Sequence, residues 1–248
     1  MICDNGKIIE QKQIAKDIYR MVITSPITDQ MIPGQFVNIA VDGMTLRRPI
    51  SICSIDPDSF TIIYKVVGAG TKRLSTMSVG QSINVFGPLG HGYPIETNRN
   101  EVLLIGGGCG VPPLYELAKR YCEAGVHVDV VMGFSDHDIV FYEDEFRALG
   151  ANVIVATMDG SYGVQGTVLD AIHTAEIPTD FICACGSLPM LKALEKHYTN
   201  GYFSLESRMA CGMGACMACV AHDAQSAEMY HRICKEGPVF PIGKVVLS

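Results

Sequence analysis

Residues 101–113 read Glu-Val-Leu-Leu-Ile-Gly-Gly-Gly-Cys-Gly-Val-Pro-Pro, an apolar run that ends in a glycine-rich turn and two prolines. A continuous apolar run is typical of a buried parallel strand, and prolines are tolerated in the first turn of a helix. The stretch therefore predicts a strand, a tight turn and a helix, with backbone N–H groups of the turn close to a phosphate. The fingerprint GxGxxG is incomplete because Val111 occupies its last glycine position, so a standard dinucleotide site is not predicted.

The same alternation continues from this stretch towards the C-terminus. Helix-like, amphipathic segments lie at 114–122, 141–149, 168–173 and 189–198, and strand-like segments lie between them at 127–132, 152–156 and 181–184. Strands that alternate with helices predict a doubly wound parallel sheet, which binds ligands at the carboxyl ends of its strands. We expect this α/β domain to span residues 99–201.

On the N-terminal side, the pattern changes to short β-strands. Runs of β-branched and aromatic residues are separated by prolines and glycines, at residues 8–9, 18–24, 36–41, 51–55, 60–67 and 82–86. This pattern is typical of a closed antiparallel β-barrel, and only Thr71 to Met77 is helix-like. We expect the barrel domain to span residues 1–98.

Four of the ten cysteines crowd into the C-terminal segment, with the spacing Cys211-x4-Cys216-x2-Cys219-x14-Cys234. Zinc ribbons usually present two C-x2-C pairs, whereas C-x4-C-x2-C is the plant-type spacing for a [2Fe–2S] cluster. A structural zinc site or inert thiols are the alternative. Residues 202–248 are too few to bury a large core, so we expect an inorganic centre to hold this third module together.

Composition limits the remaining possibilities. The chain has 248 residues, 48% of them hydrophobic and 18% charged, and a net charge of −7. This composition is globular, and the acidic balance argues against nucleic-acid binding. The sequence lacks an apolar run of the roughly 20 residues that a membrane span needs, and its start does not resemble a signal peptide. We therefore expect a cytoplasmic protein.

Three further features carry binding chemistry. Arg48-Pro49-Ile50-Ser51 offers a guanidinium to a pyrophosphate and a hydroxyl to a flavin ring, and Gly68-Ala69-Gly70-Thr71 offers backbone N–H groups at a helix start. Cys183-Ala184-Cys185-Gly186-Ser187 ends another parallel strand. Asp136 follows a strand, where its carboxylate can accept from a ribose hydroxyl and would repel a 2′-phosphate, which favours NAD over NADP. Taken singly, these features also fit helix capping and an exposed loop carboxylate.

In this order, the motifs Arg-Pro-Ile-Ser, Gly-x-Gly-Thr, Gly-Cys-Gly-Val-Pro-Pro and Cys-Gly-Ser-Leu-Pro-Met resemble the ferredoxin–NADP reductase superfamily. The segments 206–216 and 234–240 extend the likeness, so that the whole chain is similar to the electron-transfer subunits of dihydroorotate dehydrogenase B. The resemblance implies FAD on the barrel, NAD on the α/β domain, and a [2Fe–2S] cluster that lies towards a second, FMN-bearing catalytic subunit.

The resemblance also assigns residues to each cofactor. It implies that FAD contacts Arg48, Pro49, Ile50, Ser51, Tyr64, Lys65, Val66, Gly70 and Thr71. It implies that NAD contacts Gly108, Gly110, Pro113, Cys185 and Gly186, with Cys185 near the reactive ring. The superfamily usually has an aromatic residue where this sequence has Ile50, so the residue that stacks on the flavin is not predicted.

Cofactor chemistry sets the order of the sites. A nicotinamide exchanges two electrons and a cluster one, whereas a flavin does both, so FAD is expected between them. The sequence offers no constellation for acyl or phosphoryl chemistry, and electrons are expected to enter through another protein. The resemblance implies the path from partner FMN through cluster and FAD to NAD⁺, in pyrimidine biosynthesis, within a heterotetramer of two copies of each chain.

Two alternatives remain open. The first is an NAD(P)H-dependent reductase subunit of a sulfide dehydrogenase or bifurcating transhydrogenase. The second is a non-catalytic nucleotide-binding module with a structural zinc.

Overall fold

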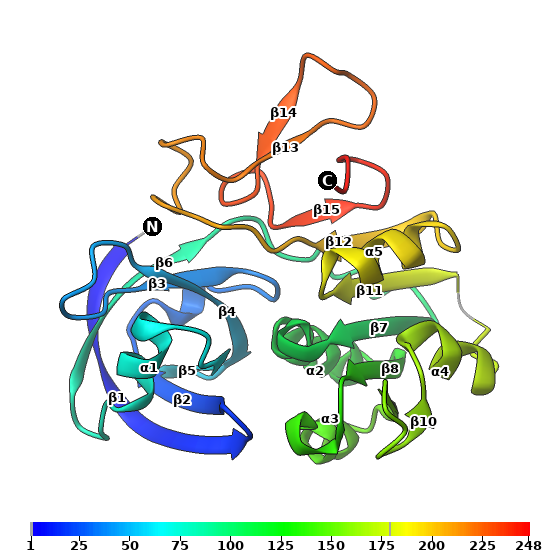
Figure 1. The fold of residues 1–248 in the computed structure, drawn as a ribbon, viewed down its shortest axis with the longest axis horizontal. Coiled ribbons are helices and arrows are strands. Elements are labelled where there is room, and N and C mark those ends of the chain that lie inside the picture. Colours follow the sequence, from blue (N-terminus) through cyan, green and yellow to red (C-terminus); the bar gives the residue numbers. More distant parts are fainter. Residues whose placement is uncertain (1, 179) are drawn as a thin grey trace.

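Six antiparallel strands close the N-terminal part into a barrel, as predicted (Figure 1). The computed structural model describes residues 2–178 and 180–248. Around the barrel the strand order is β1-β2-β5-β4-β3-β6. The strands are Ile2–Ala15 (β1), Ile18–Thr24 (β2), Phe36–Ile39 (β3), Arg48–Ile55 (β4), Ser59–Lys65 (β5) and Ser82–Leu89 (β6), with a 3-10 turn at Thr28–Gln30.

The barrel differs from the prediction in one strand and one helix. β1 is much longer than the predicted pair Ile8-Ile9, because its first half pairs with β6 and its second half with β2, while most of its side chains face solvent. Helix α1 spans Ala69–Ser75 and begins before the predicted Thr71. The hydroxyl of Thr71 accepts from the N–H of Gly68 at 3.2 Å, and the helix starts two residues earlier than predicted.

The second part is a seven-stranded sheet in the order β10-β9-β8-β7-β11-β12-β15. All neighbouring strands run parallel except β15, which is antiparallel to β12 at one edge. The strand order reverses between β7 and β11, so the sheet is doubly wound, as predicted. The strands are Glu101–Gly107 (β7), His127–Phe134 (β8), Asn152–Thr157 (β9), Val164–Gln165 (β10), Phe181–Cys185 (β11), Asn200–Ser204 (β12) and Val239–Pro241 (β15).

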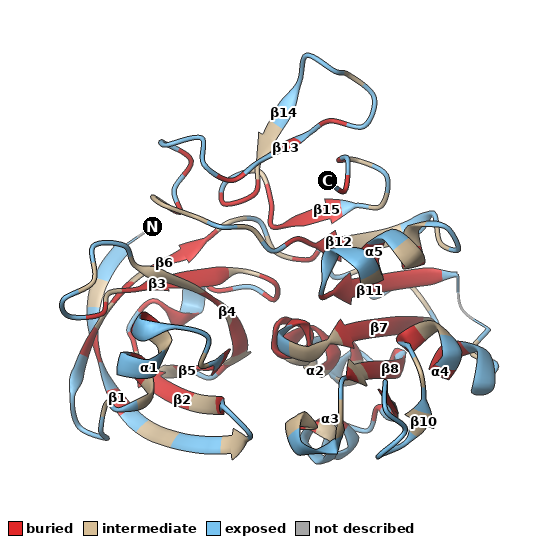
Figure 2. Ribbon diagram, viewed as in Figure 1, coloured by how far each residue is buried: buried red, intermediate tan, exposed pale blue. Residues whose placement is uncertain are grey.

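Helices cover both faces of this sheet. The helices are α2 (Tyr115–Glu123), α3 (Glu143–Ala148), α4 (Val168–Thr174) and α5 (Leu188–Glu195), and 3-10 turns lie at Gly108–Gly110, Pro112–Leu114 and His137–Ile139. One core packs α2 and α3 on one face, and another packs α4 and α5 on the other. β7, β8 and β11 are therefore buried along most of their length (Figure 2). No helix in the described ranges is long and apolar enough to cross a membrane.

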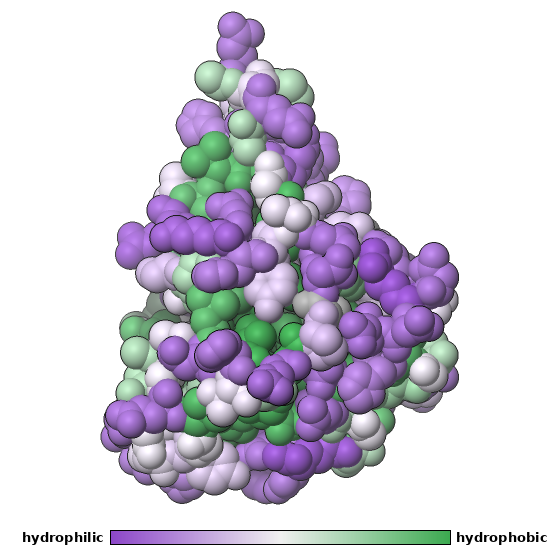
Figure 3. All heavy atoms as spheres, turned by 90° about the vertical axis from the view of Figure 1, so that its right-hand side faces the viewer, coloured by the Kyte–Doolittle hydropathy of each residue, from purple (hydrophilic) through white to green (hydrophobic). Residues whose placement is uncertain are grey.

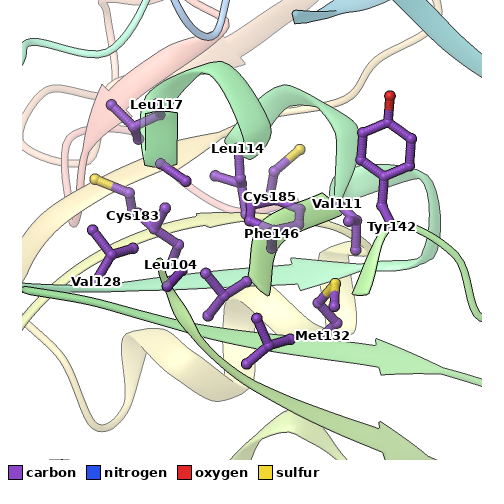
Figure 4. Close-up of a cluster of buried hydrophobic side chains, with 14 of the residues drawn as sticks. Leu104, Val111, Leu114, Leu117, Val128, Met132, Tyr142, Phe146, Cys183 and Cys185 are labelled. Carbon is purple, nitrogen blue, oxygen red and sulfur yellow. The ribbon is translucent and has the colours of Figure 1, made fainter. Parts of the chain in front are cut away.

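Side chains from both layers interlock in the first of these cores. Figure 4 shows Leu104, Val128 and Met132 of the sheet facing Leu114 and Leu117 above them. All five side chains are fully or almost fully buried. This packing fixes α2 and the residues that precede it on the sheet, directly behind the glycine turn that follows β7.

The cysteine-rich segment is inserted between two adjacent strands of the sheet. β12 runs across the predicted boundary at 201/202, and β15 returns to pair with it. Between them lies a small hairpin of Val220–His222 (β13) and Tyr230–Arg232 (β14), which projects from the top of the molecule in Figure 1. The core of the segment is shared with Phe36 and Leu89 of the barrel, which follows from its small size.

A buried carboxylate ties the sheet part to the barrel. Glu116 in α2 has no exposed surface, and its carboxylate accepts from the N–H of Ile55 at the end of β4 (3.0 Å) and from Nε of Arg120 (2.7 Å). Lys119 donates to the carbonyl oxygen of Ile55 at 3.3 Å. Burial raises the pKa of Glu116, against the effect of these donors. The contact therefore fixes α2 on the barrel.

Replacing Glu116 by alanine should destabilise the folded chain by about 2–4 kcal/mol, because it leaves the N–H of Ile55 and the guanidinium of Arg120 without their buried acceptor. Urea denaturation followed by fluorescence measures the change. The matched control is Glu123→Ala at the exposed end of the same helix, which should change stability by less than about 0.5 kcal/mol. Equal losses for the two variants would contradict the role of Glu116.

Candidate functional site

The first cavity lies where the barrel, the sheet and the cysteine-rich segment meet, and it has a volume of about 330 Å³. Six of the residues predicted to contact FAD line it, namely Pro49, Ile50, Ser51, Tyr64, Lys65 and Thr71. Val66 is not among the lining residues, whereas its neighbour Val67 is. The structure therefore brings the flavin motif of β4, the end of β5 and the start of α1 to one cavity.

Arg48 and Gly70 are in direct contact beside this cavity. A Cβ on residue 70 would lie 2.2 Å from Nε of Arg48, so the guanidinium occupies the space that a side chain would need. The Thr71 hydroxyl accepts from the N–H groups of Val67 (2.9 Å) and Gly68 (3.2 Å) and orders the same turn. A cation placed on a glycine-containing turn suits a pyrophosphate.

Aromatic and apolar side chains form the inner wall. Tyr64 is buried, its ring stacks on Tyr19 with centroids 5.9 Å apart, and its hydroxyl accepts from Gln11 at 2.8 Å. Burial raises the pKa of Tyr64 to about 12, so its hydroxyl stays protonated. Ile50 presents an aliphatic wall to the cavity where an aromatic residue was expected from the superfamily. Ile50 therefore offers apolar contact, and the aromatic rings of the same lining are those of Phe36 and Tyr64.

The sequence reasoning missed the acidic residue of this cavity. Glu206 lines it together with Ser204 and Met209, just beyond the carboxyl end of β12. Although part of Glu206 is open to solvent, burial around its carboxyl raises the pKa of that group. The position of Glu206 in the sequence could have revealed it, because ligands of such a sheet bind at the carboxyl ends of its parallel strands and Glu206 follows one of them closely.

The second cavity lies at the carboxyl ends of the sheet strands and has a volume of about 580 Å³. Its lining includes Gly107 and Gly108 where β7 ends, Phe134 and Ser135 where β8 ends, and Met190 of α5. Most of the other lining residues are apolar, among them Ile139, Met158, Val168 and Leu169. The predicted nucleotide edge of the sheet therefore carries a largely apolar cavity. Figure 3 looks onto the opposite side of the sheet, the right-hand side of Figure 1, where apolar surface also gathers within a polar rim.

One glycine turn separates the two cavities. Gly108 faces the second cavity, whereas the next residue, Cys109, lines the first. A Cβ on Gly110 would lie 2.1 Å from the carbonyl oxygen of Cys185, so the turn rests directly on the end of β11. Cys185 itself borders the first cavity with only 1% of its surface exposed, and burial raises the pKa of its thiol. Ligands in the two cavities would therefore meet at this turn.

The other predicted nucleotide residues have different positions. Gly186 is buried against the side chain of Met190, next to the second cavity. Pro113 is buried under the start of α2 and lines neither cavity. Asp136 is also absent from the described linings, and its carboxylate accepts from the N–H of Asp138 (3.1 Å) and from the Ser135 hydroxyl (2.5 Å). The Asp136 carboxylate therefore caps a 3-10 turn beside the cavity.

The four cysteines lie in one loop system as two pairs. Three backbone N–H groups point at the Cys211 sulfur, those of Ala215 (3.3 Å), Cys216 (3.4 Å) and Met213 (3.5 Å). The N–H of Cys211 in turn donates to the sulfur of Cys216 at 3.5 Å. The N–H of Cys234 donates to the sulfur of Cys219 at 3.4 Å, which forms the second pair. N–H groups directed at sulfur are the environment that an iron–sulfur cluster requires.

The donor set fits a [2Fe–2S] cluster, because two thiol pairs supply two ligands for each iron. Within residues 2–178 and 180–248, no three His, Cys, Asp or Glu side chains converge closely enough to hold a metal ion as they stand. Each pair has to bind only one iron of the cluster, so three ligands need not converge on one point. Gly212 and Gly214 in the intervening loop are both at positive φ, which glycine adopts without strain.

Amide donors outweigh burial at the first cysteine. Burial opposes ionisation of the Cys211 thiol, but the N–H groups of Met213, Cys216 and Ala215 lower its pKa to about 6. At the second pair, burial and the neighbouring Cys219 thiol raise the pKa of Cys234 to about 12. Cys211 is thus the cysteine prepared to bind metal as thiolate.

Solved structures define the class of protein. A chain from the structure of the NADH-dependent reduced ferredoxin-NADP oxidoreductase, studied for flavin-based electron bifurcation, aligns with a TM-score of 0.88 at 32% identity, over 98% of this chain and 90% of that chain. Amycolatopsis cytochrome P450 reductase GcoB has the same fold, with a TM-score of 0.69 at 21% identity, over 79% of this chain and 65% of that chain. The fold is that of a flavin-dependent oxidoreductase of the ferredoxin-reductase type.

Sequence comparison names the family. Residues 206–246 match the iron-sulfur cluster binding domain of dihydroorotate dehydrogenase B. The dihydroorotate dehydrogenase B (NAD(+)) electron transfer subunits of Bacillus cereus (strain G9842) and Bacillus mycoides (strain KBAB4) are each 49% identical to this chain, over 98% of both sequences. The chain belongs to this family of electron transfer subunits.

The contact between Arg48 and Gly70 predicts weaker flavin binding in Arg48→Ala. Removal of one charge-assisted contact to a pyrophosphate should lower the affinity for FAD by about ten- to a hundredfold. Fluorescence titration of the flavin-free chain with FAD measures this affinity. Arg73→Ala on the exposed side of α1 is the control and should bind FAD like the unmodified chain. Equal affinities of the two variants would remove Arg48 from the site.

The amide donors around Cys211 predict a reactive thiolate in the metal-free, reduced chain. Because the thiolate is the nucleophile, alkylation of Cys211 by iodoacetamide should reach half its maximal rate near pH 6. Cys183 is fully buried with a raised pKa and should stay unmodified until urea is added. Peptide mass mapping across pH 5–9 reports both thiols. If Cys211 reaches half its maximal rate only near pH 8.5, the pH about equal to the ordinary pKa of a free thiol, this arrangement is contradicted.

Proposed function

We propose that the chain is the electron-transfer subunit of a dihydroorotate dehydrogenase and that it delivers electrons from an FMN-bearing catalytic subunit to NAD⁺. One observation carries the proposal: the three sites adjoin in the order that electron transfer needs. A single turn separates the two cavities at Gly108 and Cys109. Met209 lines the first cavity only two residues before Cys211.

The barrel residues bind FAD in this proposal. Arg48 and Gly70 hold the pyrophosphate, and Pro49, Ile50, Ser51, Tyr64, Lys65, Val66 and Thr71 surround the rest of the molecule. Bound flavin exchanges two electrons with a nicotinamide and single electrons with an iron–sulfur cluster. Two residues of the sheet part then face the flavin, Cys185 and Glu206. Burial raises the pKa of Glu206, which favours the protonated form of its carboxyl group.

The second cavity binds NAD⁺ in this proposal, with Gly108, Gly110 and Gly186 next to the nucleotide. Among the described residues that line it, none is a lysine or an arginine. A 2′-phosphate would therefore lack a cationic partner there, which supports NAD over NADP. Asp136 adds a negative charge close by, and Pro113 supports the turn from below.

The cluster binds at Cys211, Cys216, Cys219 and Cys234 and faces the partner protein in this proposal. Large apolar side chains are exposed around it, namely Met213, Met217, Val220, Met229 and Tyr230. Exposed apolar groups of this kind support a protein interface. Electrons would enter at this face, where the cysteine loop and these exposed apolar side chains lie together in the sequence.

The proposal divides the chain by cofactor into residues 1–98 for FAD, 99–201 for NAD and 202–248 for the cluster, with β12 shared by the last two. It places the chain in the cytoplasm, in a heterotetramer of two copies of each subunit. The pathway served is the synthesis of pyrimidines.

A second candidate is a reductase subunit of a bifurcating enzyme. The TM-score of 0.88 to a chain of the NADH-dependent reduced ferredoxin-NADP oxidoreductase favours it, although that chain is less similar in sequence than the dihydroorotate dehydrogenase subunits. The two candidates share all three sites and differ in the partner.

An anaerobic visible spectrum of the purified chain tests the proposal. We expect flavin and cluster bands that bleach on addition of NADH, together with about two iron and two sulfide per chain, as a [2Fe–2S] cluster requires. Addition of the FMN-bearing subunit should then give NADH formation that depends on dihydroorotate. A colourless chain that contains zinc would overturn the redox assignment, and reduction without dihydroorotate activity would favour the bifurcating reductase.

A further inference from the structure

A buried amide joins the barrel to the cysteine loop. Asn38 lies in β3 with 1% of its surface exposed, and its Nδ2 donates to the carbonyl oxygen of Cys211 at 3.4 Å. The other amide atom, Oδ1, is also buried and has no hydrogen-bond partner in the described part of the chain. An aliphatic side chain of similar size would leave no polar atom unpaired there, so barrel packing alone does not account for the amide.

The strand register sets this amide beside the flavin motif. β3 lies between β4 and β6, with Asn38 opposite Pro49 on β4 and opposite Phe86 on β6. Pro49 lines the first cavity. Asn38 therefore touches the cysteine loop and also pairs with the strand that is proposed to hold FAD.

The backbone of the cysteine loop is shaped to receive this amide. Gly212, directly after Cys211, has φ +68°, and a Cβ on it would lie 2.0 Å from Nδ2 of Asn38. Glycine meets both demands at once, because it adopts positive φ without strain and leaves room for the amide. The backbone at Cys211 is thus held by Asn38 on the barrel side, while the loop amides surround its sulfur.

Asn38 is itself held in place from the barrel. The guanidinium of Arg47 donates from Nη1 to the backbone oxygen of Asn38 at 3.2 Å and from Nη2 to Oδ1 of Asn84 at 2.5 Å. It also lies over the ring of Phe86, 5.9 Å from its centroid. The amide therefore projects from a strand position that charged and ring contacts make rigid.

We propose that Asn38 is a positioning residue, which holds the first cluster ligand in register with the flavin-binding strand. The inference rests on the proposed cluster at Cys211, Cys216, Cys219 and Cys234. A hydrogen bond to the backbone of a ligand residue fixes the direction of its sulfur, and such outer contacts tune metal retention and electronic structure. Loss of the amide frees the Cys211 backbone and leaves the flavin cavity intact.

The test compares full-length Asn38→Leu and Asn38→Asp with the unmodified chain under anaerobic conditions. Both variants keep the approximate size of the side chain and lose the donor to Cys211. We expect iron transfer to an excess of chelator to be about three- to tenfold faster in both, as loss of a single supporting hydrogen bond predicts. The EPR spectrum of the dithionite-reduced cluster should change, while FAD content and the rate of FAD reduction by NADH stay within about twofold.

The matched control is Asn152→Leu, which removes an amide on β9 that bonds Asp129 at 2.7 Å, and it should leave the iron release and the EPR spectrum unchanged. The proposal is overturned if both Asn38 variants release iron at the rate of the unmodified chain and give the same EPR spectrum as that chain. If neither variant retains FAD, Gly212→Ala decides instead, since its Cβ collides with the amide. This variant has to accelerate iron release with FAD retained, and unchanged release overturns the proposal. An unmodified chain without iron would instead show that the proposed function fails.

Discussion

Contact between two backbones, at Gly110 and Cys185, sets the relation between both cavities. A Cβ on residue 110 would lie 2.1 Å from the carbonyl oxygen of Cys185, so only glycine lets the turn after β7 rest on the end of β11. This happens where the strand order of the sheet reverses. As a result Cys109 faces one cavity and Gly108 the other. Any larger residue at 110 would lift the turn off the end of β11 and change the spacing of the two cavities.

Local patterns in the sequence were sufficient for the barrel, the doubly wound sheet and the spacing of the cysteines. Features that depend on distant contacts were not predictable. β1 was underestimated because its polar, exposed residues pair with two different strands, and β15 has no local signal apart from its partner β12. Glu206 and Asn38 were missed for the same reason, since each belongs to a site built from segments far apart in the chain.

One residue type has opposite properties in different parts of this fold. Cys53 and Cys183 are fully buried within apolar cores, and burial raises their pKa, so they behave as small apolar side chains. Cys211 lies where the turn of the chain directs three N–H groups at its sulfur, and its pKa is lowered. Sequence spacing separates these two kinds of cysteine, but the backbone around the sulfur explains the difference.

The insertion of the cysteine-rich segment between β12 and β15 also orders events during synthesis of the chain. β12 leaves the ribosome before the four cysteines, and β15 leaves after all of them. Until β15 arrives, the outer edge of β12 is unpaired, and an open strand edge is prone to pair with other chains. Because β15 follows all four cysteines, it closes the sheet and completes the cysteine loop at the same time, so delayed maturation of the loop would coincide with the stage most exposed to aggregation.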